Sequence, residues 1–244
     1  IVKDNVILAE GFHRGPGLAH AELDAIQNAK SDLTGATIYC NLEPCCHTNK
    51  RTPPCAQRII KEGFSKVIIS NLDPNPEVAG TGIQMLRDAG IEVQTGILTE
   101  EGKLLNEIFF HHIVNQRPFV HLKMAQTLDG KLASKTMDSK WITSNDSREN
   151  VHQERNNYDA ILVGANTLRQ DNPTLTVRIA KKPIKAIKRI ILSLSGDFDP
   201  NLNVFTDKYK DQTLVVIPNN LKQDFTFKTI HCPLNKSGEF NLDF

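Results

Sequence analysis

The strongest constraint on the fold of this 244-residue chain is a set of three metal-binding residues that are far apart in the sequence. His20 opens a predicted helix, the Pro-Cys pair that ends at Cys45 precedes a second one, and Cys55 follows after nine further residues. A histidine nitrogen and two thiolates can hold Zn²⁺ at three corners of a tetrahedron, which leaves the fourth corner for water in a catalytic site. We therefore expect a fold that brings these three side chains to one point.

Glu22 lies two residues after the first predicted ligand and is the candidate catalytic residue. At that spacing its carboxylate can face the bound water without binding the metal, take a proton from it and pass the proton to a leaving amine. A His-x-Glu followed by Pro-Cys and a further Cys is the signature of zinc nucleobase deaminases, although their usual gap between the cysteines is shorter. The pattern favours a zinc-dependent deaminase.

Cys46 leaves a second kind of site open, because a fourth thiolate next to Cys45 would close the coordination and make the zinc structural. We favour Cys45, since it belongs to the Pro-Cys pair of the motif, and interpret Cys46 as a non-ligand. Free cysteines are commonly buried, and Cys40, in the middle of a predicted strand, is expected in the core. A non-catalytic module with a closed zinc site remains the alternative.

Composition and charge exclude several other classes of protein. Hydrophobic residues make up 39% of the chain, charged residues 23%, and the formal net charge is +1, as in globular rather than disordered or polybasic proteins. No apolar stretch approaches the roughly 18 residues that cross a bilayer, and the clustered cysteines suit a metal site in a reducing compartment. We expect a cytoplasmic protein with no membrane or nucleic-acid partner, because its basic run lacks interleaved aromatic residues. That run comprises Arg178, Lys181, Lys182, Lys185, Lys188 and Arg189.

Hydrophobic periodicity predicts strands that alternate with helices, which is typical of α/β domains. A hairpin with its turn at Asp4-Asn5 opens the chain, and a helix over 20–29 follows. The polar turn at 115–118 is the one good linker candidate, so we predict domains of 1–115 and 116–244. The remaining predicted strands are 36–41, 66–70, 91–95, 119–125, 160–164, 189–194 and 213–217; the remaining helices are 55–63, 80–89, 99–113 and 145–156, the last with Ser144 or Asn145 as N-cap.

Longer motifs point to one family. The first half contains His20-Ala21-Glu22, Leu42-Glu43-Pro44-Cys45, Thr52-Pro53-Pro54-Cys55 and Asp73-Pro74-Asn75-Pro76-Glu77-Val78-Ala79-Gly80. The second half contains Leu128-Asp129-Gly130-Lys131, Ser139-Lys140-Trp141-Ile142-Thr143 and Asp171-Asn172-Pro173-Thr174-Leu175-Thr176-Val177-Arg178. With these motifs the chain resembles, over nearly its whole length, the bifunctional riboflavin-biosynthesis family, which joins diaminohydroxyphosphoribosylaminopyrimidine deaminase to 5-amino-6-(5-phosphoribosylamino)uracil reductase.

The resemblance implies a cytidine-deaminase-like three-layer α/β/α domain followed by a partial dihydrofolate-reductase-like α/β domain. The first would use Zn²⁺ to deaminate 2,5-diamino-6-(5-phosphoribosylamino)pyrimidin-4(3H)-one, a small phosphoribosyl pyrimidine. The second would use NADPH to reduce the ribosyl side chain of 5-amino-6-(5-phosphoribosylamino)uracil to ribityl. No Gly-x-Gly-x-x-Gly follows a predicted strand, so NADPH binding is implied by the resemblance alone. The resemblance also implies a homo-oligomer.

The resemblance assigns site residues as well. Lys50 is an alternative to Arg51 as the contact to the substrate phosphate, because the gap between the ligand cysteines is one residue longer than the family's usual spacing. The implied zinc ligands are His20, Cys45 and Cys55, the proton shuttle is Glu22, the substrate contacts are His47, Arg51, Asp73, Ser139, Arg155, Leu175 and Arg178, and the NADP contacts are Ala125, Trp141, Thr167 and Asp171.

The chain departs from the family pattern at both ends. It starts after the family's N-terminal helix and Asn-Pro-containing substrate loop, and it stops before the glycine-rich NADP segment of the reductase domain. We therefore expect a piece truncated at both ends, in which the C-terminal part of the reductase domain is missing. Two other enzymes remain alternatives: a deaminase whose second domain has lost reduction, and a nucleic-acid deaminase with the same core, which the lack of a strand-binding surface disfavours.

Overall fold

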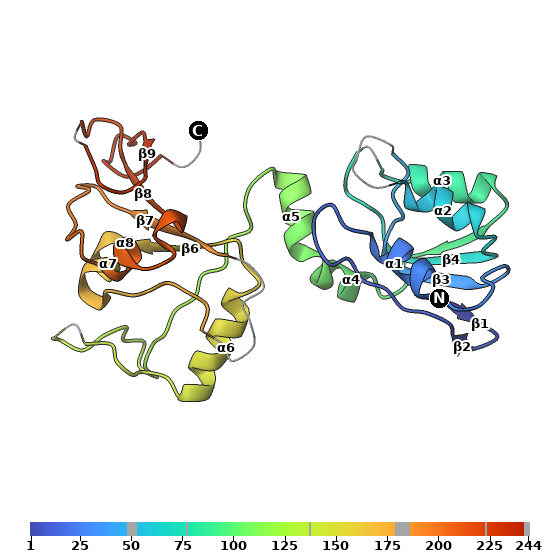
Figure 1. Ribbon diagram of the computed structural model, residues 1–244, viewed down its shortest axis with the longest axis horizontal. Coiled ribbons are helices and arrows are strands. Elements are labelled where there is room, and N and C mark those ends of the chain that lie inside the picture. The colour runs from blue at the N-terminus through green and yellow to red at the C-terminus, as the bar shows by residue number, and fades with distance from the viewer. Residues whose placement is uncertain (48–52, 77, 137, 179–185, 223, 242–244) are drawn as a thin grey trace. The chain divides into compact units, whose positions relative to one another are not determined.

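The computed structural model describes residues 1–47, 53–76, 78–136, 138–178, 186–222 and 224–241. Their contacts divide the chain into two compact units, Ile1–Leu122 and Lys123–Phe244, and each unit is described by itself (Figure 1). The predicted domain boundary after residue 115 lies seven residues before this division, at the end of helix α5 (Glu107–Asn115). The chain beyond α5 stays with unit 1, because the ring of Phe119 packs edge-on against His111 with 5.5 Å between centroids. None of the described helices has both the length and the apolar character to cross a membrane.

Unit 1 is built on a five-stranded sheet with the order β2-β1-β3-β4-β5 (Figure 1). Strands β1 (Val2–Lys3) and β2 (Val6–Ile7) form the predicted hairpin, in which Asp4 and Asn5 adopt φ values of 50° and 61°. Two residues with positive φ are what a tight turn of this kind requires, and Asn and Asp tolerate them. Strands β3 (Thr37–Leu42), β4 (Lys66–Asn71) and β5 (Glu92–Thr95) run parallel. The predicted α/β class is confirmed.

The parallel strands are connected by helices that share one hydrophobic core. Helices α1 (Ala21–Asn28), α2 (Cys55–Lys61) and α3 (Thr81–Asp88) contribute Ile26, Ile59 and Leu86 to it, and the sheet contributes Ile38, Val67 and Ile69. Because β3 and β4 point the same way, the residues that follow their carboxyl ends meet at one edge of the sheet. That edge carries the candidate site of unit 1.

The helix predicted over 99–113 is divided in two. Helix α4 (Thr99–Leu105) ends at Asn106, whose φ of −107° and ψ of 14° depart from helical values, and α5 begins at Glu107. The amide of the Asn106 side chain donates to the carbonyl of Gly102, 2.9 Å away, which also accepts the backbone amide of Asn106 at 3.2 Å. Periodicity alone could not reveal this break, because apolar residues continue on both sides of it.

Unit 2 contains a parallel four-stranded sheet with the order β6-β7-β8-β9. Its strands are β6 (Ala160–Gly164), β7 (Lys188–Leu192), β8 (Thr213–Pro218) and β9 (Thr229–Cys232). Its helices are α6 (Asn145–Arg155), α7 (Ala165–Asp171) and α8 (Asn203–Thr206), with a 3₁₀ turn at Lys210–Gln212. Of the two predicted N-caps for α6 the structure selects Ser144, whose hydroxyl accepts the amide of Ser147 at 3.2 Å.

The strand predicted over 119–125 is wrong. None of the described strands pairs with this segment, and Val120 and Leu122 are 82% and 76% exposed. A strand exists only where a neighbour satisfies its backbone hydrogen bonds, and local apolar alternation cannot supply that neighbour.

Arg189 is a charged residue in the core of unit 2, where it is 1% exposed. Its guanidinium donates to both carboxylate oxygens of Asp207 at 2.7 and 2.9 Å and to the carbonyls of Val204 and Thr174 at 2.9 and 3.0 Å. Its Nε donates to the hydroxyl of Thr213 at 3.0 Å. These bonds offset the cost of removing the charge from water and attach the segment around Thr174 to the sheet.

Candidate metal centre and neighbouring sites

The three predicted zinc ligands converge in unit 1. His20 is the residue before α1, Cys55 is the first residue of α2, and Cys45 lies in the connection that leaves β3. The Nδ1 atom of His20 lies 3.4 Å from the sulfur of Cys45 and 3.5 Å from that of Cys55, and all three donor atoms lie within 4.8 Å of one another. Both cysteines are buried, so the fold delivers two thiols and an imidazole to one protected point.

This geometry fits a tetrahedral zinc ion. Ligand atoms about 2.0–2.3 Å from Zn²⁺ lie roughly 3.5–3.8 Å from one another when the angles are tetrahedral. The two nitrogen–sulfur distances therefore match the edges of such a site. The backbone amide of Cys55 also points at the sulfur of Cys45, 3.4 Å away, and a donor in that position stabilises a thiolate.

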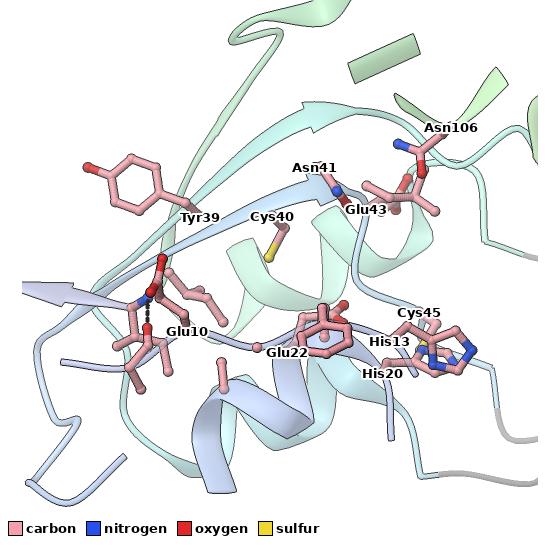
Figure 2. A pocket seen from close by; sticks show the side chains of 18 of the residues that line it. Glu10, His13, His20, Glu22, Tyr39, Cys40, Asn41, Glu43, Cys45 and Asn106 are labelled. Atoms are coloured by element: carbon pink, nitrogen blue, oxygen red, sulfur yellow. Dashed lines mark hydrogen bonds between the residues drawn. The ribbon is translucent and has the colours of Figure 1, made fainter. Parts of the chain in front are cut away.

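Glu22 lies in the first turn of α1, on the same pocket as the metal-binding residues. Figure 2 shows Glu22, His20 and Cys45 around this pocket. Burial raises the pKa of the Glu22 carboxyl, and the nearby Cys45 thiol raises it further, while the imidazole of His20 opposes them. A carboxyl in this position can accept and return a proton, as a proton shuttle must.

The two other cysteines of this region do not join the cluster. Cys46 packs with the apolar core of unit 1, and among the described residues the converging donors are those of His20, Cys45 and Cys55. This arrangement favours an open three-ligand site. Cys40 packs against the same core, as predicted, and burial raises the pKa of its thiol well above the usual value, with the Glu22 carboxylate adding to the effect.

A cavity of about 840 Å³ adjoins the cluster, and its lining includes His20, Glu22, Cys45 and Asp73. It also includes His13, which none of the sequence motifs identifies. The His13 ring packs edge-on against that of His20 with 5.3 Å between centroids, and its Nδ1 lies 2.9 Å from the carbonyl of Ala19 (Figure 2). A histidine in a glycine-flanked loop has no periodic signal, so this proximity comes only from the fold.

Of the predicted substrate residues of unit 1, the structure describes Asp73 and His47. Asp73 is 8% exposed, and its carboxylate accepts the amide of Asn75 at 2.8 Å. Burial raises the pKa of Asp73, and the carboxylate of Glu43 adds to this, while His47 lowers it. His47 thus lies close enough to Asp73 to act on its charge. Arg51 and its alternative Lys50 lie outside the described residues.

Three of the predicted substrate residues of unit 2 lie together. A guanidinium nitrogen of Arg155 on α6 donates to the carbonyl of Thr176 at 2.8 Å, and one of Arg178 donates to the hydroxyl of Thr174 at 2.7 Å. Leu175, between these threonines, is 6% exposed and has a φ of 50°. The fold therefore brings two cations to one short segment, an arrangement that suits a phosphate. Ser139 is half-buried in the segment before α6, and the described contacts do not join it to this cluster.

The predicted NADP residues occupy two places in unit 2. Thr167 and Asp171 lie one turn apart on α7, which begins directly after the carboxyl end of β6. Trp141 is 71% exposed, and the guanidinium of Arg148 lies over its ring, 4.4 Å from the centroid. Ala125 is half-buried in the irregular segment between α5 and α6. Within the described residues, no contact joins Thr167 and Asp171 on α7 to Trp141 or Ala125 in the segment before α6.

His152 provides a pH test of the cationic cluster. Burial lowers the pKa of His152 to about 4, helped by the charges of Arg155 and Arg178, and its Nδ1 accepts the backbone amide of Arg178 at 3.2 Å. Between the usual pKa of 6.5 and about 4, the unfolded chain binds a proton that the folded unit does not, so stability falls as the pH falls through this window. We expect His152→Gln to reduce this loss.

The measurement is urea unfolding at a series of pH values. Hydrogen exchange of the amides in β6–β8 monitors the unfolding, because these strands belong to unit 2. His231→Gln is the matched control, because His231 is exposed on β9 of the same unit, and it should keep the wild-type pH dependence. An unchanged pH dependence in His152→Gln would contradict the assignment.

Comparison with known proteins gives two family matches. Residues 1–71 match the family described as the cytidine and deoxycytidylate deaminase zinc-binding region. Residues 118–233 match the RibD C-terminal domain. Together they confirm the fold classes expected for the two halves of the chain.

Individual relatives cover both halves. Riboflavin biosynthesis protein RibD of Actinobacillus pleuropneumoniae is 50% identical over 189 residues, which are 77% of this chain and 50% of that protein. RibD of Aquifex aeolicus is 47% identical over 84% of this chain and 55% of that protein. The chain thus spans about half the length of the curated relatives it matches.

Solved structures match a larger share of this chain than these two relatives do. The diaminohydroxyphosphoribosylaminopyrimidine deaminase/5-amino-6-(5-phosphoribosylamino)uracil reductase of Thermotoga maritima superposes with a TM-score of 0.82 at 42% identity, covering 93% of this chain and 65% of that one. RibD of Acinetobacter baumannii, form 1, superposes with a TM-score of 0.82 at 34% identity, covering 97% of this chain and 67% of that one.

Proposed function

The chain belongs to the family of the riboflavin biosynthesis protein RibD, and on this premise we propose that unit 1 is a zinc-dependent hydrolytic deaminase. Its substrate is 2,5-diamino-6-(5-phosphoribosylamino)pyrimidin-4(3H)-one, in keeping with the deaminase named for the Thermotoga maritima relative. The observation that carries the proposal is the convergence of the donor atoms of His20, Cys45 and Cys55 within 4.8 Å of one another, with His20 and Cys45 on the pocket that Glu22 also lines.

The mechanism assigns each residue one task. Zn²⁺ held by His20, Cys45 and Cys55 would supply the Lewis-acid chemistry that makes water nucleophilic near neutral pH. Glu22 takes a proton from the attacking water and delivers it to the departing amine, so that the oxygen of water replaces the amino nitrogen on the pyrimidine and ammonia leaves. Asp73, with His47 beside it, binds the pyrimidine from the edge of the sheet.

We propose further that unit 2 contributes to the NADPH-dependent reduction of the ribosyl chain to ribityl. Arg155 and Arg178, on either side of Leu175, would bind the substrate phosphate. Thr167 follows the carboxyl end of β6, where nucleotides bind in open parallel sheets, and the exposed ring of Trp141 is available for stacking. Ala125 and Asp171 complete the proposed NADPH contacts and Ser139 the substrate contacts. The protein positions the two partners, and the hydride comes from the cofactor.

The deciding experiment measures zinc content, ammonia release and NADPH oxidation on the same preparation, with the pyrimidine phosphate supplied with and without NADPH. We expect about one zinc per chain and ammonia release that does not require NADPH. The same assays on a chain with the full length of its relatives test the reductase step, which should follow deamination. Zinc without ammonia release from either chain would support a structural zinc module instead.

The remaining partner assignments follow from the same proposal. The substrate is a small molecule, and we propose that neither nucleic acid nor a membrane is a partner. The homo-oligomer implied by the family also remains a prediction, which sedimentation of the full-length protein would test.

A further inference from the structure

Glu43 is a buried carboxylate that neither the metal cluster nor the proposed mechanism uses. It follows the last residue of β3 and is 3% exposed. Its Oε2 atom accepts the backbone amides of Gly80 at 3.0 Å and Asp73 at 3.4 Å, and its Oε1 atom accepts the amide of Ile83 at 3.2 Å. One side chain thus binds two points of the connection between β4 and α3, at Asp73 and Gly80, and one point in the first turn of α3, at Ile83.

These bonds explain why a carboxylate is tolerated in this position. Burying a charge is costly unless the charged oxygens receive hydrogen bonds, and each Glu43 oxygen receives at least one from a backbone amide. Ile83 lies in the first turn of α3, where backbone amides have no acceptor within the helix. The N-cap of α3 is Gly80, which has no side chain to cap it, so Glu43 does so from another segment.

Close packing keeps the carboxylate and α3 in contact. A Cβ atom added to Gly82 would collide with the carbonyl oxygen of Pro44 and lie 3.1 Å from Oε1 of Glu43. Only glycine allows α3 to approach the connection that carries Cys45 this closely. The end of β3 and the start of α3 are therefore closely packed around the carboxylate.

We propose that Glu43 is a positioning residue that sets the place of Asp73 relative to Cys45. Glu43 lies two residues before Cys45 in the chain and holds the amide of Asp73, and Cys45 and Asp73 line the same cavity. Through this bond the carboxylate fixes the distance between Cys45, a proposed zinc ligand, and Asp73, a proposed substrate contact. The inference rests on the proposed deaminase function and extends it by a residue outside the reacting groups.

The test is Glu43→Gln, which keeps the size of the side chain but turns one acceptor oxygen into an amide donor that faces a backbone N–H. We expect zinc to stay bound and kcat to change little, while KM for the pyrimidine phosphate rises by about 10–100-fold, since the variant disturbs binding rather than chemistry. Glu100→Gln is the matched control, because Glu100 is exposed on α4, and its KM should equal that of the wild type.

A double-mutant cycle separates positioning from a general structural role. If Glu43 acts through Asp73, then adding Glu43→Gln to Asp73→Asn should change KM by less than about 2-fold. The proposal would be overturned if the two substitutions had additive effects on log KM. It would also be overturned if Glu43→Gln lost its zinc and its kcat fell. If Glu43→Gln does not fold, Glu43→Asp, which keeps the charge but shortens the reach, enters the same cycle. No ammonia release by the wild type would overturn the proposed function and this assignment with it, whereas an active wild type with an unchanged KM in the variant overturns this assignment alone.

Discussion

Replacing Glu22 with Gln should lower the rate of ammonia release by about 10²–10⁴-fold, the usual contribution of a general acid–base group. The amide is nearly the same size as the carboxyl but cannot take a proton from water and return it to the departing amine. The pKa of Glu22 is raised by burial, so the group is suited to carry a proton between two steps, and the substitution removes that capacity.

Zinc content decides whether this loss is chemical. Glu22 is not one of the converging donors, so Glu22→Gln should retain the wild-type amount of metal. Glu100→Gln provides a control for the same substitution at an exposed site. Ammonia release at the wild-type rate from Glu22→Gln would end the assignment of Glu22 as the proton shuttle, and a loss of zinc would indicate a structural role.

The second large effect concerns the metal itself. Cys45→Ala should reduce the bound zinc from about one ion per chain to nearly none and abolish ammonia release, because an imidazole and one thiolate hold Zn²⁺ far more weakly than three ligands. The stability of unit 1 should fall as well, since metal binding adds to the free energy of folding. Metal analysis and thermal unfolding with and without a chelator measure both consequences.

Cys46→Ala is the matched control, since it removes the neighbouring, equally buried thiol. Cys46 packs in the apolar core, and this variant should keep its zinc and its activity while unfolding at a somewhat lower temperature. Loss of zinc from Cys46→Ala would instead reveal a closed four-ligand site and favour the non-catalytic module over a deaminase.

Local chemistry can be read directly from the amino-acid sequence. The residue types and spacing of His20, Cys45 and Cys55 predict a zinc site, since one imidazole and two thiolates can hold Zn²⁺ at three corners of a tetrahedron. The turn at Asp4-Asn5 is predictable too, because it depends on the backbone preferences of the residues themselves. Sequence does not choose between Ser144 and Asn145 as N-cap, because both residues have side chains that can cap a helix.

Elements that depend on distant neighbours are harder to predict. The apolar run at 119–125 resembles a strand, but none of the described strands pairs with it. The helix over 99–113 divides at Asn106, and β9 arises from a stretch of weak periodicity. In each case the outcome depends on backbone partners or packing that a short window of sequence does not contain.

The α/β class, the candidate metal ligands and the candidate proton shuttle are all predictions of the sequence, since they depend on residue type, spacing and period. The grouping of buried charges with their partners follows only from the tertiary fold: Glu43 lies against the amides of Asp73, Gly80 and Ile83, and Arg189 against Asp207. The physical reason is that a buried charge is stable only where several donors or acceptors surround it, and those partners come from segments that only the fold brings together.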